Sequence, residues 1–142
     1  MNIADLRTKA ENGNVAAQTA LGACYLDGIE VAPDYAEAFR LLSAASAAGA
    51  SRAMLNLARM LAEGLGTPKN HAEAVRFYDS AAQRGEFLAQ IELGRAFSRG
   101  IGVAKDASLA RKWYSAALAQ ENSVSAPEEI AEARTYIANA SG

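Results

Sequence analysis

The sequence predicts an all-α protein built from repeated pairs of antiparallel helices. Two observations lead to this fold class. The chain repeats itself every 36 residues in three consecutive copies, and 34 of its 142 residues are alanine while only 3 are proline. Alanine has the highest intrinsic helix propensity, and its small side chain lets neighbouring helices approach closely. A fixed period of this length is typical of arrays of two-helix units.

The repeat covers residues 13–48, 49–84 and 85–120 without insertion or deletion. Abundant alanine alone can align one alanine position by chance, but it cannot align glycines and leucines as well. We therefore interpret the period as a structural repeat. Six positions are identical in all copies: Gly13, Gly49 and Gly85; Ala17, Ala53 and Ala89; Leu21, Leu57 and Leu93; Gly28, Gly64 and Gly100; Ala38, Ala74 and Ala110; Ala45, Ala81 and Ala117.

The first helix of each copy is predicted from its apolar spacing. In the middle copy it runs over residues 50–63, where Ala53, Leu57 and Leu61 recur at steps of four on one face. Gly64 follows at the position where a helix end favours a left-handed residue. We expect the repeated leucines at 21, 57 and 93 to point into the core.

The second helix of each copy begins after a side chain that can cap a helix N-terminus. In the middle copy this residue is Asn70, with Glu73 three positions later as a reciprocal cap. The first copy has the same arrangement at Asp34. The third keeps Asp106 but has a leucine three positions on, so its cap should be weaker. Short connections between these helices predict antiparallel neighbours.

The two flanking segments are predicted to be capping helices within one domain over residues 1–142. Residues 1–12 match a second helix without its partner. In residues 121–142 the repeat ends, and Ser125 followed by Pro127 signals a new helix start. Its apolar stripe would cover the open face of the third copy, as a terminal cap must. The stripe consists of Ala126, Ile130, Ala133 and Ile137.

These positions resemble the Sel1-like repeat, a 36-residue relative of the tetratricopeptide repeat. The third copy carries the pattern best, in Ala89, Leu93-Gly94, Phe97, Gly100-Ile-Gly102-Val, Asp106, Ala110, Trp113 and Ala116-Ala117. Three positions depart from it: Glu30 and Ala58 replace glycines of the other copies, and Glu121 replaces the closing glycine. The resemblance implies a right-handed α-solenoid that acts as an adaptor for protein partners, without chemistry of its own, and a bacterial source.

Composition excludes several classes of function. With 14 basic and 16 acidic residues, the chain has a formal charge of −2 and no overall attraction for nucleic acid or anionic membranes. One cysteine and one histidine exclude a disulfide framework and a His–His metal site. We expect no cofactor, no metal and no membrane span. We also expect a cytoplasmic location, although the sequence leaves a periplasmic or secreted fragment open.

Each residue that could carry chemistry has a simpler structural interpretation. The loop over residues 64–69 has the glycines of a phosphate-binding loop, but its pattern recurs at residues 100–105, which indicates a repeat loop. His71 lies beside a helix start and should be exposed. Cys24 aligns with Met60 and Ala96, so a buried or half-buried thiol is expected rather than a reactive one. Trp113 aligns with apolar residues and should belong to the core.

The core does not account for a second stripe on the first helix of each copy, which is mostly polar in copies two and three and mostly alanine in copy one. By resemblance to tetratricopeptide arrays, this stripe lines the inner curve of the solenoid. We expect Arg59 and Arg95, 36 residues apart, to stand on adjacent helices about 9–10 Å between axes and to bind a carboxylate. Leu55, Leu88 and Ile91 are either groove floor or core. The predicted partner-binding residues are Arg52, Asn56, Arg59, Glu92, Arg95 and Arg99.

The sequence thus predicts a protein-interaction module rather than an enzyme, with a peptide or helix of another protein, of acidic character, as its partner. Reversing the charge of both Arg59 and Arg95 should abolish partner capture and leave thermal melting unchanged. Two alternatives remain open. One is a hydrolase acting on cell-wall or β-lactam substrates, for which no Ser, His and Asp recur in a suitable spacing. The other is a helical-repeat RNA binder, which the acidic balance opposes.

Overall fold

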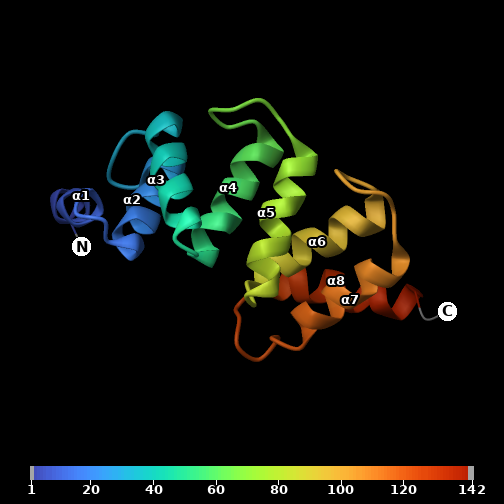
Figure 1. The fold of residues 1–142 in the computed structure, drawn as a ribbon. Coiled ribbons are helices and arrows are strands. Elements are labelled where there is room, and N and C mark those ends of the chain that lie inside the picture. Colours follow the sequence, from blue (N-terminus) through green and yellow to red (C-terminus); the bar gives the residue numbers. More distant parts are fainter. Residues whose placement is uncertain (1, 141–142) are drawn as a thin grey trace. The chain divides into compact units, whose positions relative to one another are not determined.

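The computed structural model describes residues 2–140. Over that range it contains eight α-helices and no β-strand (Figure 1). The helices are α1 (Ile3–Glu11), α2 (Val15–Asp27), α3 (Tyr35–Ala47), α4 (Ser51–Glu63), α5 (His71–Gln83), α6 (Phe87–Arg99), α7 (Ala107–Leu118) and α8 (Pro127–Ala140). The predicted all-α fold is confirmed.

The helices follow the predicted order of the repeat. The first helices of the three copies are α2, α4 and α6, which we call the A helices, and the second helices are α3, α5 and α7, the B helices. The flanking helices α1 and α8 are also present. The predicted start at residue 50 is one residue early, because Ala50 is the extended N-cap residue of α4.

The chain divides into two compact units. The first contains α1–α4 and ends at Asn70, and the second begins at His71 and contains α5–α8. In the first unit consecutive helices pack on each other, and α4 packs on α3 and, less extensively, on α2. In the second unit α8 packs on α7 and, less extensively, on α6 in the same way. Thus α8 takes the place of a further A helix. The single domain and the right-handed superhelix stay predictions.

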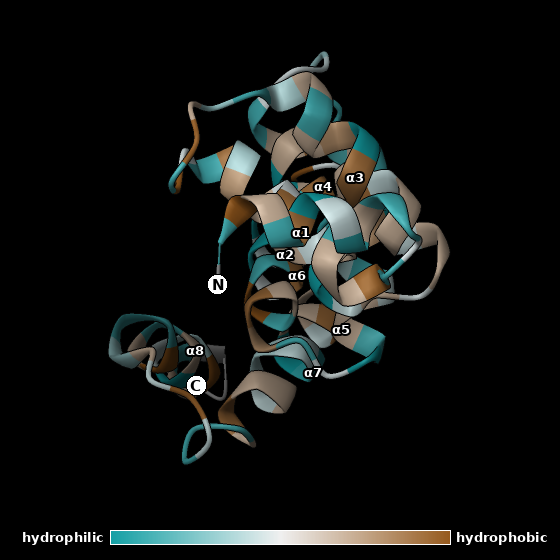
Figure 2. Ribbon diagram, turned by 90° about the vertical axis from the view of Figure 1, so that its left-hand side faces the viewer, coloured by the Kyte–Doolittle hydropathy of each residue, from teal (hydrophilic) through white to brown (hydrophobic). Residues whose placement is uncertain are grey.

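The repeated leucines lie in the core. Leu21, Leu57 and Leu93 are only 2%, 1% and 0% exposed, which confirms that these leucines point inward. Brown apolar segments and teal polar segments alternate along most of the helices in Figure 2. The apolar faces are therefore held between helices, and burying one leucine side chain contributes about 2 kcal/mol.

The loop between an A helix and its B helix has one conformation in all three copies. In the middle copy Gly64 ends α4 in the left-handed region, and Leu65 N–H donates to the Met60 carbonyl at 2.9 Å. Asn70 N–H donates to the Leu61 carbonyl at 2.9 Å and closes the loop. The same closing bond joins Asp34 N–H to Tyr25 and Asp106 N–H to Phe97.

The second loop glycine of copies two and three touches the start of the preceding B helix. A Cβ atom on Gly66 would lie 2.5 Å from the Cβ of Tyr35, and one on Gly102 would lie 2.5 Å from the His71 carbonyl oxygen. Both glycines also have positive φ, at 71° and 75°. In copy one this position is Glu30, also at positive φ (62°). This explains why copy one can have Glu30 in place of the loop glycine. Among the described residues, no B helix of equal length precedes copy one and contacts its loop.

The outward face of α1 is polar where a B helix is normally apolar. Asp5 and Lys9 are exposed. The equivalent residues of α3, one repeat later, are Leu41 and Ala45, and these are only 3% and 0% exposed. Such charges oppose the packing of another A helix against this face. They are typical of a terminal capping helix in a repeat array.

The A helices differ in their N-terminal caps, which leads to a first prediction. Asn14 caps α2 through its side chain, which accepts from Ala17 N–H at 2.8 Å. Ala50 has nearly the same backbone angles (φ −73°, ψ 109°, against −70° and 113°) but no side-chain cap bond. We expect Ala50→Asn to raise the free energy of unfolding by about 1 kcal/mol in urea denaturation. The control Ala50→Leu adds bulk without an acceptor, and an equal gain in both variants would contradict the prediction.

Candidate functional site

In the polar stripe of the first unit, one arginine side chain binds carboxylates of two A helices. Arg59 on α4 donates through Nη2 to Asp27 Oδ1 at 2.9 Å and through Nε to Glu63 Oε2 at 3.2 Å. Asp27 ends α2, so this guanidinium joins one A helix to the next. Its side chain is 43% exposed, and exposed ion pairs of this kind contribute less than about 1 kcal/mol.

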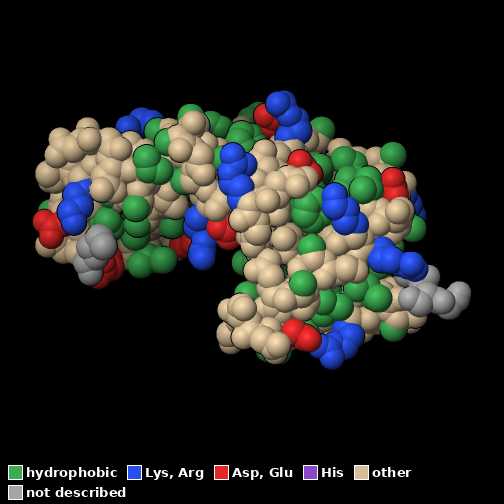
Figure 3. Space-filling model, turned by 60° about the horizontal axis from the view of Figure 1, so that its bottom comes forward, with side chains coloured by type: hydrophobic (Ala, Val, Ile, Leu, Met, Phe, Trp, Pro, Cys, Tyr) green, Lys and Arg blue, Asp and Glu red, His purple; other side chains and the backbone are tan. Residues whose placement is uncertain are grey.

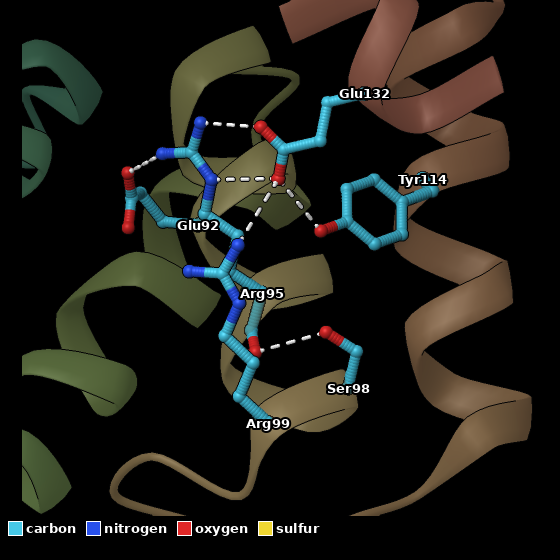
Figure 4. Close-up of polar contacts among 6 residues, drawn as sticks. All are labelled: Glu92, Arg95, Ser98, Arg99, Tyr114 and Glu132. Carbon is cyan, nitrogen blue, oxygen red and sulfur yellow. Dashed lines mark hydrogen bonds and ion pairs between the residues drawn. The ribbon is translucent and has the colours of Figure 1, made fainter. Parts of the chain in front are cut away.

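The polar stripe of the second unit centres on a carboxylate from the C-terminal helix (Figure 4). Arg95 on α6 binds Glu132 on α8 in a bidentate manner, with Nε to Oε2 at 2.8 Å and Nη2 to Oε1 at 2.6 Å. Its Nη1 donates to Glu92 Oε1 at 2.5 Å. The two side chains of the bidentate pair are only 28% and 27% exposed. This bidentate, partly buried ion pair holds α8 against α6.

A tyrosine completes this carboxylate site from α7. The Tyr114 hydroxyl donates to Glu132 Oε2 at 2.9 Å, and its ring lies so close to Gly94 that a Cβ there would be 2.9 Å from ring carbons. The ring also packs at 4.8 Å between centroids against Tyr136 on α8. Burial, followed by the bond to Glu132, raises the pKa of Tyr114 to about 12. Tyr114 therefore stays a neutral donor at physiological pH.

Arg99 and Leu88 form the exposed ends of the α6 stripe. Arg99 is 59% exposed in its side chain, and its Nη2 lies 4.0 Å from Glu132 Oε2, an oxygen that already accepts from two other donors. Leu88 is 47% exposed, whereas Ile91 is fully buried in the cluster with Phe87. Of the two interpretations of Ile91 that the sequence left open, the core one is therefore correct.

The electrostatics of Glu132 give a second prediction. The hydrogen bonds from Arg95, against the opposing effect of burial, lower the pKa of Glu132 below its ordinary 4.5. Because the folded-state pKa is the lower one, the stabilisation is present above pH 4.5 and is lost as pH falls through the folded pKa. We expect α8 to loosen in acid, measured by the near-UV circular dichroism of Tyr114 and Tyr136. Glu132→Gln should lack this transition, and identical titrations would contradict the assignment.

The predicted site residues fall into two groups, one in each unit. Glu92, Arg95 and Arg99 meet on α6, while Arg52, Asn56 and Arg59 lie on α4 in the first unit. Their role in partner binding stays a prediction. The expectation that a double charge reversal would leave melting unchanged is wrong for Arg95, since a carboxylate there would face Glu92 and Glu132.

Sequence reasoning missed Glu132 and Tyr114 as partners of this stripe. A signal existed for each. Glu132 directly precedes Ala133, the fully buried member of the predicted α8 stripe. Its side chain was therefore to be expected at the edge of the contact between α8 and its neighbouring helices. Tyr114 occupies the position held by Leu42 in copy one, and a buried tyrosine hydroxyl usually needs a hydrogen-bond partner.

The remaining chemical candidates lie where a structural role predicts them. His71 is exposed at the start of α5, and Trp113 is 5% exposed in the core. Burial raises the pKa of the Cys24 thiol, which lowers its thiolate fraction. Over residues 2–140 no three His, Cys, Asp or Glu side chains are grouped to hold a metal ion. No helix in this range has the length and apolarity to cross a membrane.

Comparisons with known proteins cover nearly the whole chain. The family model of the Sel1 repeat matches residues 15–49, 51–86 and 88–122. The chain is similar to a crystal structure of a Sel1 repeat protein from Oxalobacter formigenes, with 36% identity, 96% of this chain and 97% of that chain covered, and a TM-score of 0.79. No curated protein matches.

A second solved structure resembles a shorter stretch. It is a protective antigen present in uropathogenic Escherichia coli strains and displaying an SLR fold, with 37% identity and a TM-score of 0.78. The match covers 81% of this chain but only 25% of that protein. The likeness therefore concerns a repeat segment within a longer chain.

Proposed function

Because this chain belongs to the Sel1 repeat family, as its repeated positions predicted, we propose that it is a binding module for another protein. The partner contributes a peptide or helix that lies along the polar stripes of the A helices, on the face that we expect to be concave. The module holds its partner without chemistry of its own.

The observation that carries this proposal is the exposed part of the α6 stripe. Leu88 offers an apolar contact with 47% of its surface exposed, and Arg99 offers a guanidinium whose nearest carboxylate oxygen is 4.0 Å away. They are eleven residues apart, so about 16 Å of helix axis separates them. A segment with one apolar and one acidic side chain about five extended residues apart would span this distance.

The buried part of the stripe has a positioning role in this proposal. Arg95 uses three of its donor atoms on Glu132 and Glu92. We therefore replace the predicted partner contact of Arg95 by a positioning role, in which it holds the surface in shape. The charges on the rest of the drawn surface bear on the nucleic-acid alternative. Basic and acidic side chains are interspersed on the face drawn in Figure 3, where no broad area of one sign would favour nucleic acid.

Partner capture from a lysate of the source cells tests the proposal. We expect species retained by the wild-type chain to be reduced at least tenfold by Leu88→Asp and by Arg99→Glu, measured by quantitative mass spectrometry. The matched control is Arg76→Glu, an equal charge reversal on B helix α5 where the side chain is 78% exposed. Equal retention by all variants would remove α6 from the binding surface.

A further inference from the structure

Three residues of the α6 stripe face outward at fixed spacings. Leu88, Glu92 and Arg99 follow one another at steps of four and seven residues, so they lie on one face of the helix. About 6 Å and about 10 Å of helix axis separate them. The Glu92 side chain is 36% exposed, between the more exposed Leu88 and Arg99. Each of the three positions is therefore accessible to a side chain of another molecule.

One oxygen of Glu92 is the least compensated negative atom of this face. Glu92 Oε1 accepts from Arg95 Nη1, whereas no described residue donates a hydrogen bond to Glu92 Oε2. The other two bonds of Arg95 go to Glu132 (Figure 4). One guanidinium thus faces two carboxylates, and of these only Glu132 has a further donor, the Tyr114 hydroxyl. The residual negative charge therefore lies on Glu92, which can bind one more cation.

Arg99 is the least compensated positive group of the same face. Its Nη2 lies 4.0 Å from Glu132 Oε2, which is too far for a hydrogen bond and leaves a weak, exposed ion pair. Its other guanidinium nitrogens have no bond to a described residue. From the N-terminus of α6 to its C-terminus, the face thus offers an apolar, a negative and a positive contact.

A partner in α-helical form matches these spacings, and an extended segment does not. Two helices that pack at a shallow crossing angle of about 20° have the same rise per residue. Three residues of the partner, also separated by four and seven positions, then meet the three contacts in turn and share one face of their own helix. In an extended segment the matching residues are about two and three positions apart. Because its side chains alternate between faces, the third of them would point away from α6.

The charges also determine the direction of the partner's helix. A helix is stabilised by an acidic side chain near its N-terminus and by a basic one near its C-terminus. The acidic residue of the partner must lie against Arg99, at the C-terminal end of α6, and the basic residue against Glu92, nearer the N-terminal end. An antiparallel helix satisfies both conditions, whereas a parallel one reverses them.

We propose that the α6 stripe binds an antiparallel helix with an acidic residue against Arg99, a basic residue seven positions later against Glu92 and an apolar residue four positions after that against Leu88. We rest this on the proposed function and narrow its partner to an amphipathic helix that carries both charges, in place of a generally acidic segment. Glu92 determines the specificity, because it attracts the basic residue and repels an acidic one at the middle position.

Titration of the ¹⁵N-labelled, 142-residue chain with designed helical peptides tests the proposal. The probe is acetyl-Ala-Ala-Glu-Ala-Ala-Gln-Ala-Ala-Gln-Lys-Ala-Ala-Gln-Leu-Ala-Ala-amide, which places the three residues at the required spacings in a helix-forming host. In the exchanged peptide the glutamate and the lysine trade places, so composition and net charge stay the same. We expect saturable NMR shifts at the amides of α6 with the probe. The exchanged peptide should bind about tenfold more weakly, because two attractions become two repulsions.

One variant of the chain assigns this selectivity to Glu92. Glu92→Gln removes the charge but keeps an acceptor for Arg95. The wild-type chain should bind the probe about threefold more tightly than a peptide with glutamine in place of the lysine. The Glu92→Gln chain should bind these two peptides equally. The matched control is Asp79→Asn, at an exposed position of α5, which should keep the wild-type ratio.

Four outcomes would overturn the proposal. They are equal binding of the probe and the exchanged peptide, an unchanged ratio in the Glu92→Gln chain, binding that survives a proline at the centre of the probe, and absence of shifts on α6 with every peptide. If any of these occurred while Leu88→Asp still abolished partner capture, α6 would stay the binding surface and only this helix would be rejected. Capture unchanged by both Leu88→Asp and Arg99→Glu would instead reject the proposed function, and this helix with it.

Discussion

Replacing Gly102 by alanine is expected to lower the free energy of unfolding by about 3 kcal/mol. The φ angle of Gly102 is 75°, and its new Cβ would lie 2.5 Å from the carbonyl oxygen and 2.6 Å from the carbonyl carbon of His71. A backbone neighbour cannot rotate away as a side chain can. Urea denaturation followed by circular dichroism measures the loss.

Two matched variants separate backbone strain from collision. Gly85 also has positive φ (90°) but nothing within 4 Å of its Cβ position, so Gly85→Ala should cost only about 1 kcal/mol. Glu30 already carries the strain at φ 62°, and Glu30→Gly should stabilise the protein by about 1 kcal/mol. Equal losses for Gly102→Ala and Gly85→Ala would show that the loop does not press on α5.

Truncating Glu132 to alanine is expected to lower the free energy of unfolding by about 2–3 kcal/mol. The change removes the bidentate partner of Arg95 and the acceptor of the Tyr114 hydroxyl, which belongs to a residue only 2% exposed. The cost is high because a partly buried cation and a buried donor both lose a partner. Denaturation should show the loss, and hydrogen exchange should locate it in residues 127–140.

The control for this prediction is on the same helix. Glu128 is exposed one turn earlier, so Glu128→Ala should change stability by less than about 0.5 kcal/mol. Glu132→Gln keeps the shape and should fall between the two. If Glu132→Ala matched Glu128→Ala, or if its faster exchange were spread evenly over all helices, the carboxylate would not be what holds α8.

The repeat made most of the fold predictable from sequence. Each identical position reports a contact or a backbone conformation that the copies share. Leu57 is buried because the A helix needs an apolar residue there, and Gly64 adopts the left-handed conformation because the loop needs it. The helix bounds followed from the same positions, with an error of one residue at Ala50.

The contacts of the candidate site were less predictable because they are not periodic. Arg95 repeats Arg59 by 36 residues, which suggested a shared role. Their partners differ, since Arg59 binds the preceding A helix through Asp27 and Arg95 binds α8 through Glu132. Glu132 lies outside the repeat, so no alignment of copies could assign its partner. Only the packing of α8 on α6 and α7 brings these side chains together.

We expect the exposed α6 stripe to be where this module holds another protein. Hydrogen exchange of the full chain, alone and with the partner recovered by capture, would locate the contact on the chain itself. Binding should slow exchange in residues 87–99, an effect lost in the Leu88→Asp chain, with α5 unchanged. Slower exchange confined to α5 and the loop before it, with α6 unaffected, would contradict it.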